Sequence, residues 1–196
     1  RSYNLGVAAT RGDQLVLLSG DLLLNPLALA AYAASFAQLP DTVIYGYFGS
    51  DKNDIRPSCL IPGRTVNLRD ERFAFLPDGT LQFQPQMLEF PQHFAWGGGW
   101  GLRKGLFEAL GGMNEAFSGW GLEDVDFANR LLYRRGHLAF SLDVWGEHQP
   151  HALVIEPERL ARNREVLGPY WIAVQEPGLI YNPSTNRLKD LLQSQP

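Results

Sequence analysis

The sequence contains little cysteine and no long apolar run, and each shortage excludes a class of protein. Cys59 is the only cysteine among 196 residues, so no disulfide framework can form within the chain. This cysteine usage fits a reducing compartment. No apolar run approaches the roughly 20 residues that a membrane-spanning helix needs. We therefore expect a cytoplasmic protein, with at most peripheral contact at the inner face of the membrane.

Excess positive charge is also missing. Seventeen Lys and Arg residues stand against 21 Asp and Glu, which gives a formal net charge of -4. Nucleic acid is not an expected partner, because binding its phosphates needs a concentrated basic face. A hydrophobic share of 45% allows a sizeable core, and the length fits one domain better than two.

The order of the predicted elements indicates the fold class. The apolar run Gln14–Leu18 predicts a buried parallel strand, residues 27–39 predict a helix, and residues 42–48 predict a second strand. Strand, helix and strand in succession favour an α/β layer architecture, in which ligands bind at the carboxyl ends of parallel strands. Asp21 follows the first of these strands.

Further along, the pattern predicts a hairpin, two helices and one more strand. Turn residues at 77–80 separate two apolar stretches, and a glycine-rich segment lies at 96–101. We expect a hairpin from 73–76 and 81–83, a short helix at 103–110, a longer helix at 122–135, a strand at 138–145 and a loop at 146–151.

Residues 117–126 place aromatic rings, two glycines and three carboxylates at the start of the longer helix. Part of this pattern has an ordinary explanation, because acids in a first turn interact favourably with the helix dipole and Asp126 can pair with Arg130. The third carboxylate and the glycine-flanked Trp120 remain unexplained. A sugar site accounts for both, since an indole covers the apolar face of a pyranose and carboxylates accept hydrogen bonds from its hydroxyls.

Asp21 and two histidines are the candidate metal ligands. A lone Asp after a strand is more often a turn or cap residue, and two loop histidines are more often simply solvated. A carboxylate together with neutral imidazole nevertheless suits Mn²⁺ or Mg²⁺ that carries phosphates. Asp21, His148 and His151 are therefore candidates for such a site.

Two segments resemble the GT-A-fold family 2 glycosyltransferases. The start of the chain is similar to their Arg-x-x-Asn-x-Gly…Leu-Asp-x-Asp stretch, and it reads Arg1-Ser2-Tyr3-Asn4-Leu5-Gly6 and then Leu17-Leu18-Ser19-Gly20-Asp21. Residues 111–126 resemble their Gly-Gly-Phe-Asp-Glu…Gly-Trp-Gly-x-Glu-Asp-x-Asp segment, through Gly119-Trp120-Gly121-Leu122-Glu123-Asp124-Val125-Asp126. The second segment is shared with the C-terminal module of galactosyltransferases and is the more specific part of a resemblance that runs to about residue 151.

The resemblance implies a GT-A-like, Rossmann-like α/β fold with a mostly parallel sheet flanked by helices. It implies that Asp21 and His148 hold Mn²⁺ or Mg²⁺ at the donor diphosphate, and that Asp124 is the catalytic base of an inverting transfer. The expected partners are a nucleotide-sugar donor, foremost a UDP-sugar, and a glycan or other acceptor hydroxyl. The implied substrate-binding residues are Trp120, Glu123, Gly121, Arg103, Asn4 and Arg1.

One departure from the family pattern keeps a rival function open. Ser19 stands where the family has the first aspartate of its Asp-x-Asp motif, which puts the ribose or second metal contact in doubt. The rival is a non-catalytic carbohydrate-binding module, although such a module has no need of a strand-end carboxylate and a loop imidazole. A phosphatase or nuclease would need more metal-binding carboxylates than the sequence offers.

The resemblance also bears on domain organisation. We expect residues 1–170 to form the C-terminal part of a catalytic domain and residues 171–196 to form a tail. In the resembled fold, the strands that hold the nucleotide base and ribose precede the segment that begins here at Arg1. We therefore expect a truncated chain that lacks these strands and binds nucleotide poorly by itself.

Overall fold

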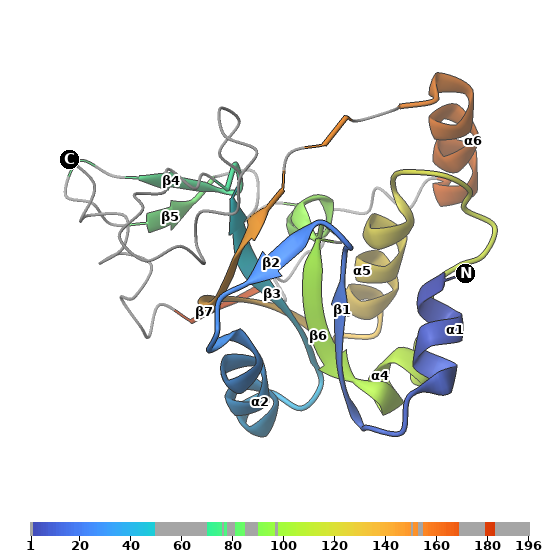
Figure 1. The fold of residues 1–196 in the computed structure, drawn as a ribbon. Coiled ribbons are helices and arrows are strands. Elements are labelled where there is room, and N and C mark those ends of the chain that lie inside the picture. Colours follow the sequence, from blue (N-terminus) through green and yellow to red (C-terminus); the bar gives the residue numbers. More distant parts are fainter. Residues whose placement is uncertain are drawn as a thin grey trace.

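The computed structural model describes residues 2–49, 70–75, 77, 81–84, 90–96, 98–149, 151–152, 155–168 and 179–182. Cys59 and Arg1 lie outside these residues. The elements are drawn in Figure 1, and their order is α1 (Ser2–Ala9), β1 (Gln14–Leu18), β2 (Leu22–Leu24), α2 (Ala28–Gln38), β3 (Thr42–Gly49), β4 (Phe73–Phe75), β5 (Leu81–Phe83), the 3-10 helix η1 (Pro91–Phe94), β6 (Gly99–Arg103), α4 (Lys104–Ala109), α5 (Glu123–Tyr133), β7 (His137–His148), α6 (Pro157–Leu167) and β8 (Leu179–Asn182).

The main sheet is mixed, which corrects the expectation of a mostly parallel sheet. Its strand order is β1-β6-β3-β7-β2, and β8 also pairs with β7. Among the described strands of this sheet, the β3–β7 and β7–β8 pairs are parallel, whereas β1–β6, β3–β6 and β2–β7 are antiparallel. A short apolar run does not show whether the neighbouring strand is parallel or antiparallel. The sequence predicted a buried parallel strand at Gln14–Leu18, but β1 stands at one end of the strand order and its residues alternate in burial.

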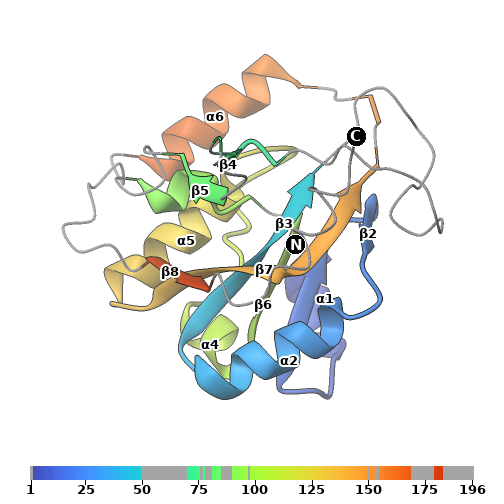
Figure 2. The ribbon, with the colours of Figure 1, turned by 90° about the vertical axis from the view of Figure 1, so that its left-hand side faces the viewer.

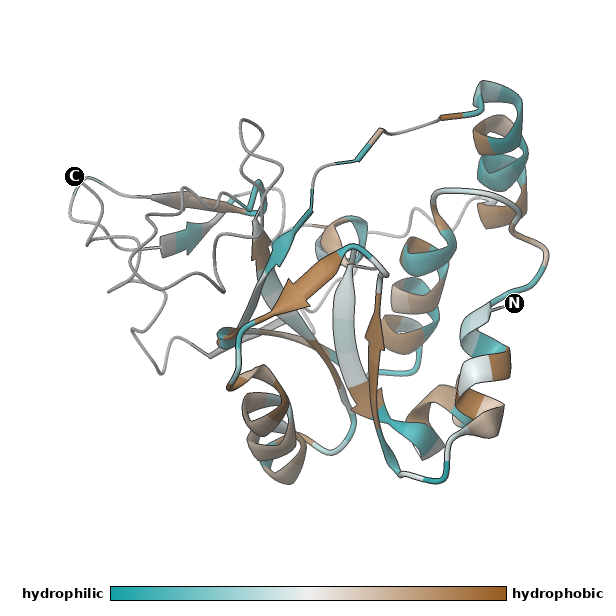
Figure 3. Cartoon of the chain, in the orientation of Figure 1, coloured by the Kyte–Doolittle hydropathy of each residue, from teal (hydrophilic) through white to brown (hydrophobic). Residues whose placement is uncertain are grey.

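Helices cover both faces of the sheet, as predicted for an α/β fold. Figures 1 and 2 show α2 on one face and α1, α4 and α5 on the other. A small apolar cluster that includes Tyr32 and Phe36 packs under α2, and a larger one lies on the opposite face. In Figure 3, hydrophobic and hydrophilic residues alternate along α5, and its buried residues include Val125, Phe127 and Leu131, as in a helix with one face on a core.

A stack of aromatic rings crosses the centre of the sheet. Tyr45 on β3 stacks on Phe140 of β7 at 5.4 Å and on Trp100 of β6 at 6.2 Å between ring centroids. Trp100 in turn contacts Phe127 of α5 at 4.9 Å. Because these rings are almost fully buried, they fix the start of α5 relative to three strands.

A buried ion pair fastens the chain beyond residue 69 to the sheet. The side chains of Asp70 and Arg72 are 1% and 2% exposed. Arg72 Nη2 donates to Asp70 Oδ2 and to the carbonyl oxygen of Gly46 at 2.6 Å. Asp70 Oδ2 also accepts a hydrogen bond from the backbone N–H of Phe48 at 2.9 Å. Both charges are therefore paired inside the fold, as burial requires.

Several elements confirm the sequence-based expectations and others do not. The strand at 42–48, the hairpin of β4 and β5, and the helices α2, α4 and α5 are confirmed, with ends within a few residues. The strands β2 and β8 and the helix α6 were not expected, and β8 comes from the segment predicted to be a tail. In the part of the chain described here, no helix combines the length and apolarity needed to cross a membrane.

The Asp70–Arg72 pair generates a prediction about stability. Asp70→Ala should lower the free energy of unfolding by about 3–5 kcal/mol, because it leaves a buried guanidinium without its counter-charge. The matched control is Asp13→Ala, whose partner Arg103 lies 3.4 Å away while the Asp13 side chain is 81% exposed. This change should cost less than about 1 kcal/mol. Urea unfolding of both variants measures the difference, and equal losses would contradict it.

Candidate active site

The pairing of β2 with β7 brings Asp21 close to His148. Asp21 lies in the turn between β1 and β2, which the bond from Leu22 N–H to the Ser19 carbonyl closes at 3.3 Å. Leu22 is the antiparallel partner of His148, and the backbone N–H of Gln149 donates to the Asp21 carbonyl at 2.7 Å. The register of this pair therefore places Asp21 beside the end of β7.

Close contact between these two strands depends on a glycine. A Cβ atom at Gly146 would lie 2.5 Å from the carbonyl oxygen of Leu23, so a larger residue would push β2 away. Asn25, which is buried and directly follows β2 in the chain, donates from Nδ2 to the Trp145 carbonyl at 2.8 Å. These contacts fix the distance between Asp21 and the end of β7.

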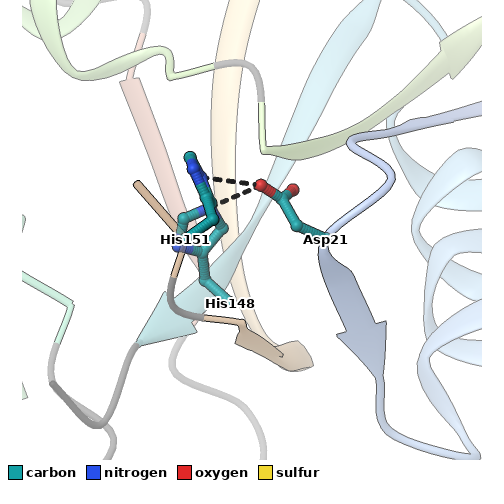
Figure 4. Close-up of side chains that lie close together, drawn as sticks. All are labelled: Asp21, His148 and His151. Carbon is teal, nitrogen blue, oxygen red and sulfur yellow. Dashed lines mark ion pairs between the residues drawn. The ribbon is translucent and has the colours of Figure 1, made fainter. Parts of the chain in front are cut away.

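Asp21, His148 and His151 form one cluster (Figure 4). The Nε2 atoms of His148 and His151 lie 3.3 and 2.9 Å from the same atom, Asp21 Oδ2. One potential ligand atom from each side chain lies within 4.8 Å of the others. In a regular octahedron with bonds of about 2.1 Å, neighbouring ligand atoms are about 3 Å apart. The three donors therefore fit a single divalent cation, and Asp21 Oδ1 is buried with no hydrogen-bond partner among the described residues.

His151 belongs to this cluster as closely as His148 does. The family resemblance implied His148 as the imidazole ligand, with a smaller role for His151. β7 runs to His148, three residues beyond the predicted strand, and His151 returns toward Asp21 after the strand has ended. The spacing alone could not show this return.

Ser19 has a structural role at the same turn. Its Oγ donates to the Gly98 carbonyl at 3.3 Å, and its backbone N–H donates to the same oxygen at 2.8 Å. Gly98 directly precedes β6, so Ser19 continues the contact between β1 and β6 beyond the last strand residue. The side chain in place of the family's first aspartate is thus used within the sheet and is not one of the three clustered side chains.

The three carboxylates at the start of α5 differ in their burial and in their contacts. Asp126 is 7% exposed and forms an ion pair with Arg130 at 2.8 Å, so the ordinary explanation holds for this residue. Glu123 and Asp124 are half-buried. Glu123 Oε2 is buried without a hydrogen-bond partner among the described residues, while Asp124 Oδ1 accepts from the N–H of Val125 at 2.8 Å.

The segment before α5 exposes Trp120. Its side chain is 54% exposed, and the glycines on either side adopt positive φ angles, +70° at Gly119 and +105° at Gly121. Leu122 also has a positive φ, +75°, which is unusual for a residue with a side chain. This backbone conformation carries the indole outward beside Glu123 and Asp124 in the chain.

Tyr3 on α1 links the metal-ligand cluster to these carboxylates. Its ring meets Trp100 edge-on at 6.1 Å. Burial raises the pKa of the Tyr3 hydroxyl above its ordinary value, and the negative charges of Glu123, Asp124 and Asp21 raise it further, in that order. Tyr3 therefore experiences negative charge from Asp21 as well as from the start of α5.

Three further residues were predicted to bind substrate: Asn4, Arg103 and Arg1. Asn4 Nδ2 donates to the Met113 carbonyl at 2.9 Å, and its Oδ1 accepts from the Met113 N–H at 2.8 Å, so its amide fastens α1 to the chain after α4. Arg103 is the last residue of β6, and its guanidinium donates to the Phe36 carbonyl. The first residue of β6, Gly99, pairs with Leu18 and is the end of the strand that lies nearer Asp21. The structure therefore does not bring Arg103 together with the other site residues. The predicted role of Arg1 falls outside the described residues.

Comparisons with known proteins lead to one enzyme class. Residues 80–144 match a family model described as the N-terminal domain of galactosyltransferase. Validoxylamine A glucosyltransferases from two subspecies of Streptomyces hygroscopicus, jinggangensis (strain 5008) and limoneus, are each 30% identical over 112 residues, or 50% of this chain. A crystal structure of GalNAc-T7 with UDP, GalNAc and Mn²⁺ has a similar fold, with a TM-score of 0.50 and 14% identity, covering 76% of this chain and 29% of that chain.

These relatives are glycosyltransferases. Their similarity to this chain supports the enzyme class predicted from the sequence, and the fold is of the type found in GT-A glycosyltransferases. The match covers 26% and 24% of the two curated relatives, so the chain spans about a quarter of their length. The family match includes the start of α5 and ends before His148.

The contact at Gly146 generates a prediction about the cluster. Gly146→Ala should weaken Mn²⁺ binding by about 10- to 100-fold, because displacement of β2 separates Asp21 from the histidines. Gly105→Ala is the matched control, since a Cβ at Gly105 on α4 has no atom within 4 Å. Titration followed by the EPR signal of free Mn²⁺ measures both affinities. Equal affinity of the two variants would show that strand contact does not set the ligand positions.

Proposed function

We propose that this chain carries the catalytic and acceptor-binding part of a metal-dependent, inverting glycosyltransferase that moves a sugar from a nucleotide sugar to an acceptor hydroxyl. The observation that carries the proposal is the cluster of Asp21, His148 and His151, in which both imidazole Nε2 atoms lie within 3.3 Å of one carboxylate oxygen. A second group of side chains, Glu123 and Asp124 next to the exposed Trp120 in the chain, stands at the start of α5. Tyr3 lies in the electric field of both groups.

The first group would bind the cation of the donor. One carboxylate oxygen and two imidazole nitrogens suit Mn²⁺, and Mg²⁺ is also possible for such a site. The cation supplies positive charge that stabilises the leaving nucleoside diphosphate. The structure of GalNAc-T7 was solved with UDP and Mn²⁺, which supports a UDP-sugar as the proposed donor. Asp21, His148 and His151 hold this end of the donor.

The second group would bind and activate the acceptor. The Trp120 indole covers the apolar face of an acceptor sugar, and Glu123 accepts hydrogen bonds from its hydroxyls. Asp124 takes the proton of the attacking hydroxyl. The hydroxyl oxygen then forms a bond to the anomeric carbon as the bond from that carbon to the diphosphate oxygen breaks. A single displacement of this kind inverts the anomeric configuration and needs only one base.

A test follows from the role of Asp124. Asp124→Asn keeps the shape of the side chain but removes the base, so kcat of transfer should fall by about 10²–10⁴-fold while affinity for the donor changes little. The control is Asp41→Asn, an exposed carboxylate next to β3 at the opposite end of the sheet, and it should leave kcat unchanged. A donor screen on the chain without substitutions first identifies a nucleotide sugar that it consumes. The kcat of both variants is then measured with that nucleotide sugar.

Three outcomes separate the possibilities. Near-normal kcat in Asp124→Asn would assign the base elsewhere, with Glu123 the next residue to change. A product whose anomeric configuration, read by NMR, matches that of the donor would exclude the single displacement. Sugar binding without consumption of any donor, with or without Mn²⁺, would instead favour a carbohydrate-binding module.

A further inference from the structure

A fully buried amide on α6 is bonded entirely to the segment that carries Trp120. Asn163 is 0% exposed, whereas its neighbours Arg162 and Arg164 are exposed. Its Oδ1 accepts from the backbone N–H of Ser118 at 3.1 Å. Its Nδ2 donates to the Ser118 carbonyl at 3.1 Å and to the Gly121 carbonyl at 2.9 Å. One side chain thus bonds both ends of residues 118–121, called here the Trp120 loop.

The packing around Asn163 covers the backbone of the same loop. A Cβ at Gly119 would lie 2.9 Å from Arg159 Cδ, and one at Gly121 would lie 3.3 Å from Leu160 Cδ1. In Figure 1, α6 stands close to the segment that leads into α5. The helix therefore encloses the glycines of the loop and leaves the indole of Trp120 exposed.

The loop needs contacts of this kind to keep its shape. Gly119, Gly121 and Leu122 all have positive φ angles, and a residue with a side chain adopts such a conformation only when its surroundings hold it there. Glycines also have many alternative conformations in a loop without outside contacts. The two hydrogen bonds that Asn163 donates and the one that it accepts select one of these conformations.

We propose that Asn163 is a positioning residue for the acceptor, acting through the Trp120 loop without touching the substrate. The inference rests on the proposed function, because it takes Trp120 as the acceptor platform. With the loop fixed, the indole keeps a constant place relative to Asp124 at the start of α5. In the described part of the chain, the hydrogen bonds of Asn163 go to Ser118 and Gly121, so we expect the donor end of the reaction to be independent of it.

The test uses Asn163→Asp, which keeps the shape and the acceptor oxygen but removes both donated hydrogen bonds. We expect kcat/KM for the acceptor to fall by about 10- to 100-fold, since a shift of about 1 Å in a bound group can cost that much. Hydrolysis of the nucleotide sugar by water should continue at the unchanged rate, because it needs no acceptor. The exposed Arg162→Ala on the same helix is the matched control and should change neither rate.

A milder variant guards against loss of folding. Leu160→Ala removes packing from Gly121 without burying a charge, and it should lower acceptor kcat/KM in the same direction with donor hydrolysis kept. An unchanged kcat/KM in both variants would overturn the proposal. Equal losses of transfer and of donor hydrolysis would also overturn it, because they would mark a general structural role.

Failure of the proposed function is recognised separately. Binding of methyl glycosides of glucose and N-acetylglucosamine, followed by saturation-transfer NMR, reports on the Trp120 loop without any transfer. If the unchanged chain binds a glycoside but consumes no donor, transfer is wrong, and weaker glycoside binding by Asn163→Asp would still support the positioning role. If the unchanged chain binds none of these glycosides and transfers to none, Trp120 is no platform and the inference is wrong.

Discussion

The short antiparallel pairing between β2 and β7 is the contact on which the candidate site depends. Asp21 precedes β2 and His148 ends β7, so the register of Leu22 opposite His148 decides whether a carboxylate and an imidazole meet. A slip of one residue would turn each side chain to the other face of the sheet. The close approach at Gly146 and the bonds from Asn25 restrain this register. Because β7 ends at His148, the chain can turn back and bring His151 to Asp21.

The core places the second half of the site against the first. The stack of Tyr45, Trp100 and Phe127 connects the central strands to α5, and α5 begins with Glu123 and Asp124. Tyr3 packs on Trp100 from α1 and experiences the charge of both halves. A rigid apolar core thus sets the separation between the proposed cation and the proposed base, while the loop that carries Trp120 depends on contacts with α6.

Sequence patterns predicted the parts of this arrangement that local chemistry decides. The helices α2 and α5 and the strand β3 follow from apolar periodicity and turn residues, and the role of Asp126 follows from its spacing to Arg130. Strand direction and the convergence of Asp21, His148 and His151 depend on pairing between distant segments, which a short apolar run does not encode. Arg103 shows the same limit, because its place in a familiar segment gave no sign that its side chain bonds to the end of α2.

The central claim is that Asp21, His148 and His151 bind one divalent cation. Pulsed EPR of Mn²⁺ added to the chain tests it most directly, because coupling to directly bound imidazole nitrogen identifies the ligands. The account predicts couplings from two nitrogen nuclei, with one lost in His148→Ala and one lost in His151→Ala. A spectrum of the fully hydrated ion, or nitrogen couplings that persist unchanged in both variants, would contradict it.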